Sequence, residues 1–358
     1  MRATTLVAVA TDVGAWRVVL PVLRELDRRG EPYRVMLAEP AASIARQDGV
    51  AHISLTAPGL DERVDAILAA RPTTLLLGTS VQSVVERALI RRIRATSAPV
   101  PTLGVLDAML FVERRFGRGL AELPDRVACP DQATADRLQQ AGAPAAALAV
   151  TGNPTLEEIW LNAGAIGCAP AHPIAPEKSE AHSVDVLFVS SPVAAMRLRG
   201  AVFAIDEREA LADVLTTLST LLDLVPGGYR VRVRLHPVQR SEGLPIPPPG
   251  IVLAPDDDPD RLGSCARAQV VVGLSSTLLG EARFLSKPAI AYLPGPFWEQ
   301  ERVFAPEYGV HLARSGEQLR ALLTRALREP AAPPPLAAHL GAAGRIADLL
   351  GALALQGE

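Results

Sequence analysis

The sequence predicts an α/β protein made of two doubly wound domains in tandem, and three observations support this prediction. Short apolar runs alternate with amphipathic stretches through residues 4–154, and a second series of the same kind begins at residue 184. Between the two series the pattern breaks, because Gly, Ala, Pro, Glu and Lys dominate residues 163–183. Continuous apolar strands that alternate with helices are typical of a parallel sheet covered on both faces. A Pro-rich stretch without periodicity is typical of a linker.

In the first domain, each apolar run predicts a strand and each amphipathic stretch predicts a helix. The helix over 16–30 is expected to close at Gly30, because glycine commonly follows the last turn of a helix. Strands are predicted at 4–10, 33–39, 73–80, 101–107, 125–131 and 147–154, and further helices near 60–70, 83–97 and 133–142. We assign residues 1–160 to an N-terminal domain and residues 161–183 to a linker.

The second domain, over residues 184–335, follows the same logic. Strands are predicted at 184–190, 229–237, 251–257, 268–276 and 287–293, and helices at 208–225 and 316–328. The run PAAPPP at 330–335 must interrupt regular structure, because proline cannot continue a helix. Residues 336–358 then form a last helix, which we expect to pack back toward the N-terminal domain.

Composition and charge exclude several classes of function. Hydrophobic residues make up 49% and charged residues 21% of the chain, as in ordinary globular proteins. A net charge of −3 gives no general attraction to nucleic acid or to an anionic membrane. No uninterrupted apolar run approaches the roughly 18 residues of a membrane span, and the N-terminus lacks the architecture of a signal peptide. Three scattered cysteines, Cys129, Cys168 and Cys265, favour neither a disulfide framework nor a zinc site. We expect a cytoplasmic protein.

Polar residues of the second domain follow four predicted strands. They are Ser190-Ser191, Arg234 with His236, Asp256–Asp258, and the run GLSST at Gly273–Thr277. The carboxyl ends of parallel strands meet at one edge of a sheet, so these groups should border one crevice. With two domains, the cleft between them is the expected site.

Each of these motifs has a plain structural explanation beside the functional one. Ser and Thr are preferred helix caps, but a helix N-terminus also offers free N–H groups and a positive dipole end to a phosphate. His236 precedes Pro237 at a strand end, so it is either a surface histidine or a donor to a leaving phosphate. Glu281 either compensates the dipole of the helix or accepts the hydroxyl groups of a ribose.

The first domain offers two carboxylates, Asp12 and Asp107, each at the end of a predicted strand. Both are expected to face the cleft, as a general base or as simple helix caps. We favour Asp12 as the base, because Gly14 nearby lets the backbone approach a ligand closely. The basic residues Arg114, Arg115 and Arg118 form either a solvated surface or a contact for an anion.

No metal site is predicted. The three adjacent acids of Asp256–Asp258 lie in a Pro-flanked turn, where such residues usually face solvent.

Three motifs carry a resemblance to a known family. TGNP at 151–154, RLHP at 234–237 and GLSSTLLGEARFLSKPAI at 273–290 resemble the GT-B glycosyltransferase superfamily. Within it, the chain resembles bacterial sialyltransferases and capsule-type transferases with HP and SS motifs, and the UDP-N-acetylglucosamine 2-epimerases, which share the fold, resemble it comparably. The motifs follow the family order along nearly the whole chain, but each is short. The resemblance implies two Rossmann-like domains facing a cleft, with the acceptor bound by residues 1–160 and the nucleotide sugar by residues 184–335.

The resemblance also implies roles for single residues. In the family these motifs hold the nucleotide phosphates, which carries over to His236, Ser275 and Ser276, and the ribose-binding glutamate carries over to Glu281. The acidic motif of the sialyltransferases is matched only faintly by residues 11–14. The Gly pair and double Glu of the epimerases are absent from GLSSTLLGEA, which disfavours an epimerase. A dehydrogenase is not expected, because no GxGxxG fingerprint occurs.

We therefore predict an inverting, metal-independent glycosyltransferase of hexosyl or sialyl type. A nucleotide sugar is its co-substrate, no bound cofactor is needed, and the acceptor is a small molecule or a glycan. The alternatives are a nucleotide-sugar 2-epimerase or hydrolase, and a non-catalytic nucleotide-binding module; a homodimer stays open. The predicted catalytic residues are Asp12, Asp107 and His236, and the predicted substrate-binding residues are Gly14, Ser190, Ser191, Arg234, His236, Gly273, Ser275, Ser276, Thr277 and Glu281.

Overall fold

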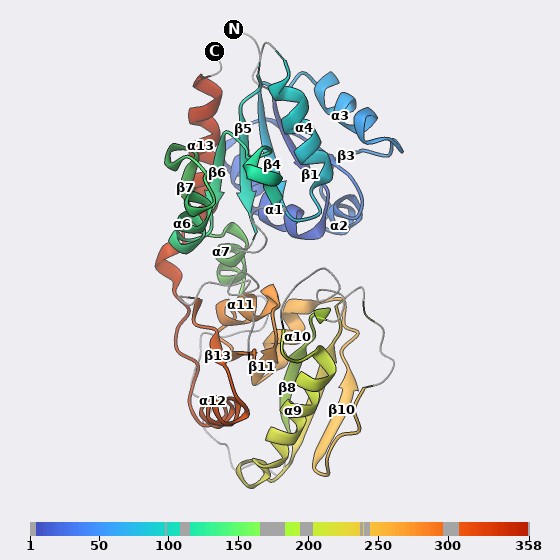
Figure 1. Ribbon diagram of the computed structural model, residues 1–358, viewed down its shortest axis with the longest axis vertical. Coiled ribbons are helices and arrows are strands. Elements are labelled where there is room, and N and C mark those ends of the chain that lie inside the picture. The colour runs from blue at the N-terminus through green and yellow to red at the C-terminus, as the bar shows by residue number, and fades with distance from the viewer. Residues whose placement is uncertain are drawn as a thin grey trace. The chain divides into compact units, whose positions relative to one another are not determined.

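The chain forms two compact units in a computed structural model (Figure 1). Unit 1 comprises Met1–Glu158 and Leu336–Glu358, and unit 2 comprises Ile159–Pro335. The structure describes residues 5–96, 99–107, 115–164, 183–193, 203–236, 239, 244–295 and 308–356. Most of the predicted linker, at 165–182, lies outside these residues, as do Arg114 and Pro237. Because segments on both sides of unit 2 in the sequence belong to unit 1, unit 2 is an insertion within unit 1.

Unit 1 is built on a seven-stranded parallel sheet in the order β3-β2-β1-β4-β5-β6-β7. Its strands are β1 (Leu6–Ala10), β2 (Tyr33–Leu37), β3 (Ile53–Ser54), β4 (Thr74–Thr79), β5 (Thr102–Leu106), β6 (Arg126–Cys129) and β7 (Leu148–Val150). Its helices are α1 (Val13–Arg29), α2 (Ala41–Gln47), α3 (Leu60–Ala69), α4 (Val84–Arg94), α6 (Gln132–Gln140) and α13 (Ala342–Gln356), and α7 (Pro154–Leu161) begins in it.

Unit 2 is built on a six-stranded parallel sheet in the order β10-β9-β8-β11-β12-β13. The strands are β8 (Val184–Val189), β9 (Tyr229–Arg234), β10 (Ile251–Pro255), β11 (Val270–Gly273), β12 (Ala289–Tyr292) and β13 (His311–Ala313). The main helices are α9 (Glu207–Ser219), α10 (Arg261–Arg267), α11 (Thr277–Phe284) and α12 (Gly316–Arg328). Two parallel α/β sheets confirm the predicted fold class.

Helix α1 shows how the sequence sets an element. Asp12 caps its N-terminus by accepting a hydrogen bond from the backbone N–H of Ala15 at 2.8 Å. Gly30 ends it in the left-handed conformation at φ 71°, which glycine adopts without strain. Between these ends, Trp16, Leu23 and other apolar side chains are buried on the sheet. The closure at Gly30 confirms the prediction.

Helix α13 completes the core of unit 1. Ile346, Leu350 and Leu353 belong to the same buried cluster as Trp16 of α1, and each such side chain contributes about 1.5–3 kcal/mol when fully buried. The stretch Leu336–Leu355 is long and apolar enough to cross a membrane by length and composition, with 33% of it buried. Arg345 and Asp348 lie within this stretch, so it is not one of the uninterrupted apolar runs considered from the sequence. The α-helix itself begins only at Ala342, after Gly341 at φ 78°.

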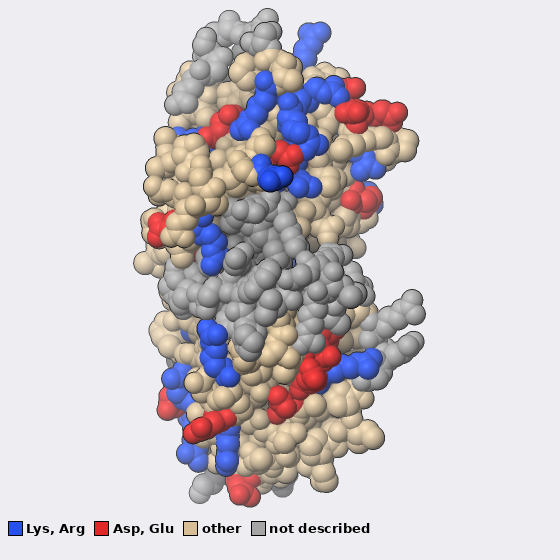
Figure 2. Space-filling model, in the orientation of Figure 1, with Lys and Arg blue, Asp and Glu red and all other residues tan. Residues whose placement is uncertain are grey.

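Basic side chains gather over α4 on the face shown in Figure 2, with acidic side chains among them. Arg87 and Arg91 both pair with Glu122, and Arg94 donates to backbone carbonyl groups. These arginines hold neighbouring loops of unit 1, so their charge is largely used within the unit.

Each sheet has one point where the strand order reverses. In unit 1 this point lies between β1 and β4, and in unit 2 it lies between β8 and β11. Ligands of open α/β sheets bind beyond the carboxyl ends of the strands at such points.

Candidate functional site

The reversal point of unit 1 is bridged by a hydrogen bond that Asp12, which follows β1, accepts. One carboxylate oxygen of Asp12 caps α1, and the other accepts a hydrogen bond from the hydroxyl of Ser80, which follows β4. Ser80 is held in turn, because its backbone N–H donates to the Ser83 hydroxyl at 2.9 Å. Asp12 is therefore fixed from both strands. Asp12 caps α1, as one of its two predicted roles requires, and it lies at the reversal point of the sheet.

Asp107 follows β5, and its carboxylate also lies beside Gly14. A Cβ atom added to Gly14 would lie 2.6 Å from one oxygen of Asp107 and 3.5 Å from one oxygen of Asp12. A larger residue there would require the carboxylate of Asp107 to move, so Gly14 lets the two predicted acids lie close together. Buried Arg115 pairs with Asp107 and donates to the carbonyl of Thr79 at 2.7 Å.

The two acids differ in charge balance. Asp107 is neutralised by Arg115, whereas Asp12 has no ion pair among the described residues. Asp12 is therefore the better candidate for a general base. Of the two interpretations of the arginine cluster, a solvated surface fits Arg118, which is exposed, but not Arg115, which is 4% exposed and pairs with Asp107.

A third carboxyl group, Glu86 of α4, lies behind this edge and was missed by the sequence analysis. It is 2% exposed, and its Oε2 accepts a hydrogen bond from the Thr11 hydroxyl at 2.5 Å. Burial raises the pKa of Glu86 to about 7; the hydrogen bond from Thr11 opposes this rise and the charge of Asp12 adds to it. The available signal was its spacing, because Glu86 shares the buried face of α4 with Leu89, Ile90 and Ile93.

The TGNP motif (151–154) supports the same edge from the side of β7. The side chain of Asn153 caps α7 through the backbone N–H groups of Thr155 and Leu156, and it donates to the carbonyl of Asp107 at 3.3 Å. Its backbone N–H donates to Nδ1 of His339 at 3.0 Å. The motif thus connects the segment before α13 to the loop that carries Asp107.

Acid should weaken unit 1 through His339. Burial lowers the pKa of His339 to about 4, so the native imidazole is neutral while the unfolded one binds a proton below about pH 6.5. The free energy of unfolding should therefore fall by up to about 3 kcal/mol as the pH drops from 6.5 to 4, with no further loss below. Denaturant titrations of His339→Asn and its parent across this pH range measure the difference. An equal acid sensitivity of both proteins would contradict this role.

The reversal point of unit 2 is bridged by two of the predicted serines. Ser191 follows β8, and its hydroxyl accepts a hydrogen bond from the backbone N–H of Ser275, which follows β11, at 3.2 Å. Ser190, Ser191 and Ser275 are all buried. At the end of β11, a Cβ atom on Gly273 would lie 2.5 Å from the carbonyl oxygen of Val189. Gly273 therefore allows β11 and β8 to approach closely at this edge.

Helix α11 begins directly after these serines. Ser276 is its cap, with the hydroxyl accepting from the Leu278 N–H at 3.3 Å, and Thr277 is its first residue. Glu281 lies beyond the first turn, which contains no acid, so dipole compensation does not explain it. It is buried and pairs with Arg261 of α10 at 2.8 Å, which fixes the orientation of its carboxylate.

Arg234 and the Asp256–Asp258 turn form a buried ion-pair network. Asp256 pairs with Arg232 and Arg234, both at 2.7 Å. Burial works against the charge of Asp256, but its hydrogen bonds outweigh that effect and hold its pKa below the ordinary value. The expectation of a solvent-facing turn was wrong for Asp256, which is 8% exposed. Arg234 is thus held by Asp256 and by the carbonyl of Asp258.

His236 lies just beyond β9 and its side chain is exposed. Its backbone N–H donates to the side-chain oxygen of Gln239 at 2.9 Å, and the Gln239 amide also donates to the carbonyl of Ser191 at 3.3 Å. Protein atoms packed on its inner side displace water and lower the pKa of His236, so the imidazole is neutral near pH 7. Gln239, also missed from the sequence, connects His236 to the serine pair.

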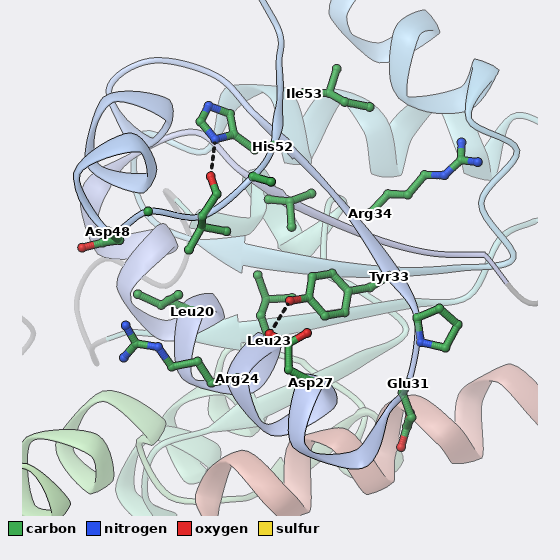
Figure 3. A pocket seen from close by; sticks show the side chains of 15 residues that line it. Leu20, Leu23, Arg24, Asp27, Glu31, Tyr33, Arg34, Asp48, His52 and Ile53 are labelled. Atoms are coloured by element: carbon green, nitrogen blue, oxygen red, sulfur yellow. Dashed lines mark hydrogen bonds between the residues drawn. The ribbon is translucent and has the colours of Figure 1, made fainter.

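A pocket of about 760 Å³ lies elsewhere in unit 1, near the start of β2 (Figure 3). Tyr33, Arg34, His52 and Ile53 line it together with residues of α1. This is the amino end of the sheet, opposite the edge that carries Asp12. Among the residues that the structure describes, no group of three or more His, Cys, Asp or Glu side chains could hold a metal ion.

Comparisons with known proteins place the fold. No protein-family profile and no curated sequence matches the chain. The UDP-GlcNAc 2-epimerase from Neisseria meningitidis, bound to UDP-GlcNAc, aligns over 98% of this chain and 100% of its own, with a TM-score of 0.67 and 15% identity. MurG from Acinetobacter baumannii aligns over 98% and 99%, with a TM-score of 0.55 and 13% identity. The glycosyltransferase of kitacinnamycin aligns over 99% and 96%, with a TM-score of 0.54 and 13% identity.

These likenesses confirm the resemblance in fold. At such low identity they do not assign an activity. They do not support the preference for a transferase over an epimerase, because the epimerase superposes better than either glycosyltransferase.

Proposed function

We propose that the chain is a nucleotide-sugar enzyme that breaks the bond between the anomeric carbon of a sugar and a nucleoside diphosphate. One observation carries this proposal. Both sheets place hydrogen-bonding groups at their reversal points, with Asp12 and Ser80 in unit 1 and Ser191 and Ser275 in unit 2. A carboxylate and a hydroxyl-rich helix start are the two kinds of group that such a reaction needs.

Unit 2 would hold the nucleotide. The start of α11 presents the positive end of the helix dipole, and Ser275 and Ser276 add hydroxyl groups at the same helix end. A neutral His236 can donate one hydrogen bond to a phosphate oxygen. These donors would stabilise the charge that develops on the leaving phosphate. Glu281, oriented by Arg261, would accept the ribose hydroxyls, as the resemblance implies.

Unit 1 would supply the proton-transfer group, and the role of that group separates two reactions. In 2-epimerisation, the C–H bond at the carbon next to the anomeric centre must break and form again on the other face. In glycosyl transfer, the base instead removes the proton of an acceptor hydroxyl. We give precedence to epimerase-like chemistry, because the epimerase is the better structural match.

Transfer is the second candidate, on the basis of the sequence at α11. GLSSTLLGEA contains one glutamate and lacks the glycine pair that the epimerases carry at this motif.

One experiment tests the proposal and separates the candidates. The purified chain is incubated with a panel of nucleotide sugars in D₂O, with and without a mixture of sugar acceptors, and the products are followed by NMR. Deuterium at the sugar C2 without acceptor identifies an epimerase. Nucleotide release that requires an acceptor identifies a transferase. Tight nucleotide binding with no release in any mixture would refute an enzyme and leave a binding module.

Chelation should leave the activity intact. The proposed phosphate donors are all protein groups, namely helix N–H groups, hydroxyls and one imidazole, so turnover should change by less than about twofold in excess EDTA. Assays with the reactive nucleotide sugar measure this directly. A complete loss that magnesium or manganese restores would contradict it and would point to the acids around Asp256.

A further inference from the structure

Glu86 is a buried carboxyl group without a cationic partner among the described residues. The nearby arginines are paired elsewhere: Arg87 and Arg91 with Glu122, Arg92 with Asp61 and Asp65, and Arg115 with Asp107. One oxygen of Glu86 contacts Thr11, and the other has no hydrogen-bond partner in the part of the chain that the structure describes. An isolated buried carboxylate is costly, and such a group avoids the cost by holding a proton.

Thr11 makes this group relevant to the site, because it directly precedes Asp12. The hydroxyl of Thr11 anchors the β1–α1 turn to Glu86, while Ser80 and the N–H of Ala15 hold the carboxylate of Asp12 itself. The turn that carries the proposed base is therefore fixed from behind by a side chain of α4.

We propose that Glu86 is a positioning residue for Asp12. The neutral carboxyl group of Glu86 anchors the β1–α1 turn without adding a second negative charge beside the base. The inference rests on the proposed function only in taking Asp12 as the base. Burial raises the pKa of Glu86 to about 7, and the negative charge of Asp12 adds to this rise. Above that pH the two carboxylates repel each other, and the turn loses its neutral anchor.

Two substitutions should shift the titration of Glu86 in opposite directions. Asp12→Asn removes a negative neighbour, so the pKa of Glu86 should fall. Thr11→Val removes the hydrogen bond that favours the ionised form, so the pKa should rise. Both can be read by NMR of protein labelled with ¹³C at the glutamate carboxyl carbon, without any substrate.

The wild type should show one glutamate signal that titrates near pH 7 and is missing in Glu86→Gln. Glu122→Gln is the matched control, because Glu122 is a buried carboxylate of the same unit that pairs with Arg91. That variant should keep the signal. A wild type in which Glu86 is already ionised at pH 6, or a signal that does not move in Asp12→Asn, would overturn the proposal.

Positioning itself is read from the backbone amide signals of Asp12 and Ala15. In the wild type these signals should shift with the same midpoint as Glu86, and in Glu86→Gln they should stay constant at their low-pH positions. In the assay with the reactive nucleotide sugar, Glu86→Gln should match wild-type kcat at pH 6 and exceed it about threefold or more at pH 8.5.

Amide signals or a kcat profile of Glu86→Gln that follow pH as in the wild type would refute the positioning role. If no nucleotide sugar reacts with the wild type, the proposed function fails, whereas the carboxyl and amide titrations still decide whether Glu86 holds the turn.

Discussion

Asp12→Asn should cut turnover of the nucleotide sugar by about 10²–10⁴-fold, the range expected when a general base is removed. The fold should survive, because asparagine is as good a helix cap as aspartate and can accept the same hydrogen bond from the N–H of Ala15. Nucleotide affinity should stay within about twofold, since the proposed phosphate donors belong to unit 2. Steady-state kinetics and calorimetric titration with the nucleotide measure the two effects separately.

Asp107→Asn is the control for this prediction. Its carboxylate is balanced by Arg115, so we expect a smaller loss of turnover than for Asp12→Asn. An active Asp12→Asn beside a dead Asp107→Asn would exchange the two roles. Normal turnover in both would mean that the carboxylates of unit 1 only hold the structure, and the mechanism would be wrong.

His236→Ala should weaken nucleotide binding and slow turnover by roughly 10²-fold, as expected when a donor to the leaving phosphate is lost. His311→Ala is the matched control, because His311 is another histidine of unit 2 and contacts Arg325 on α12. That variant should retain nucleotide affinity and kcat. Unchanged kinetics in a folded His236→Ala would assign His236 to the surface loop alone.

Much of the fold could be predicted from the sequence, because most elements carry a local signal. The apolar runs of the parallel strands and the cap at Gly30 are examples. The short elements α2, β3 and α10 were missed because each is seven residues or fewer, too short to show a period. Strand order has no local signal at all. Without the strand order, Ser80 could be recognised only as the last residue of the predicted strand at 73–80, and not as a neighbour of Asp12.

Side-chain pairing was the least predictable part of the site. Arg115 looks like surface charge in the sequence, and Asp256 looks like a turn residue, yet each forms a buried ion pair. Such pairs join segments that meet only after the sheet has formed. The carboxyl ends of parallel strands meet at one edge of a sheet, and this correctly predicted that Ser191 and Ser275 lie together. The prediction succeeded because the alternating pattern of strands and helices already implies a parallel sheet.

The insertion of unit 2 within unit 1 also fixes an order of events during synthesis. Domains fold as their residues leave the ribosome, and all of unit 2 is made before the segment that begins at Leu336. Until then, the face of α1 that receives Ile346 and Leu350 remains uncovered, and Asn153 lacks the imidazole of His339. The inserted unit can thus finish folding first, and the edge that carries Asp12 and Asp107 gains the support of His339 only after the segment from Leu336 has been made.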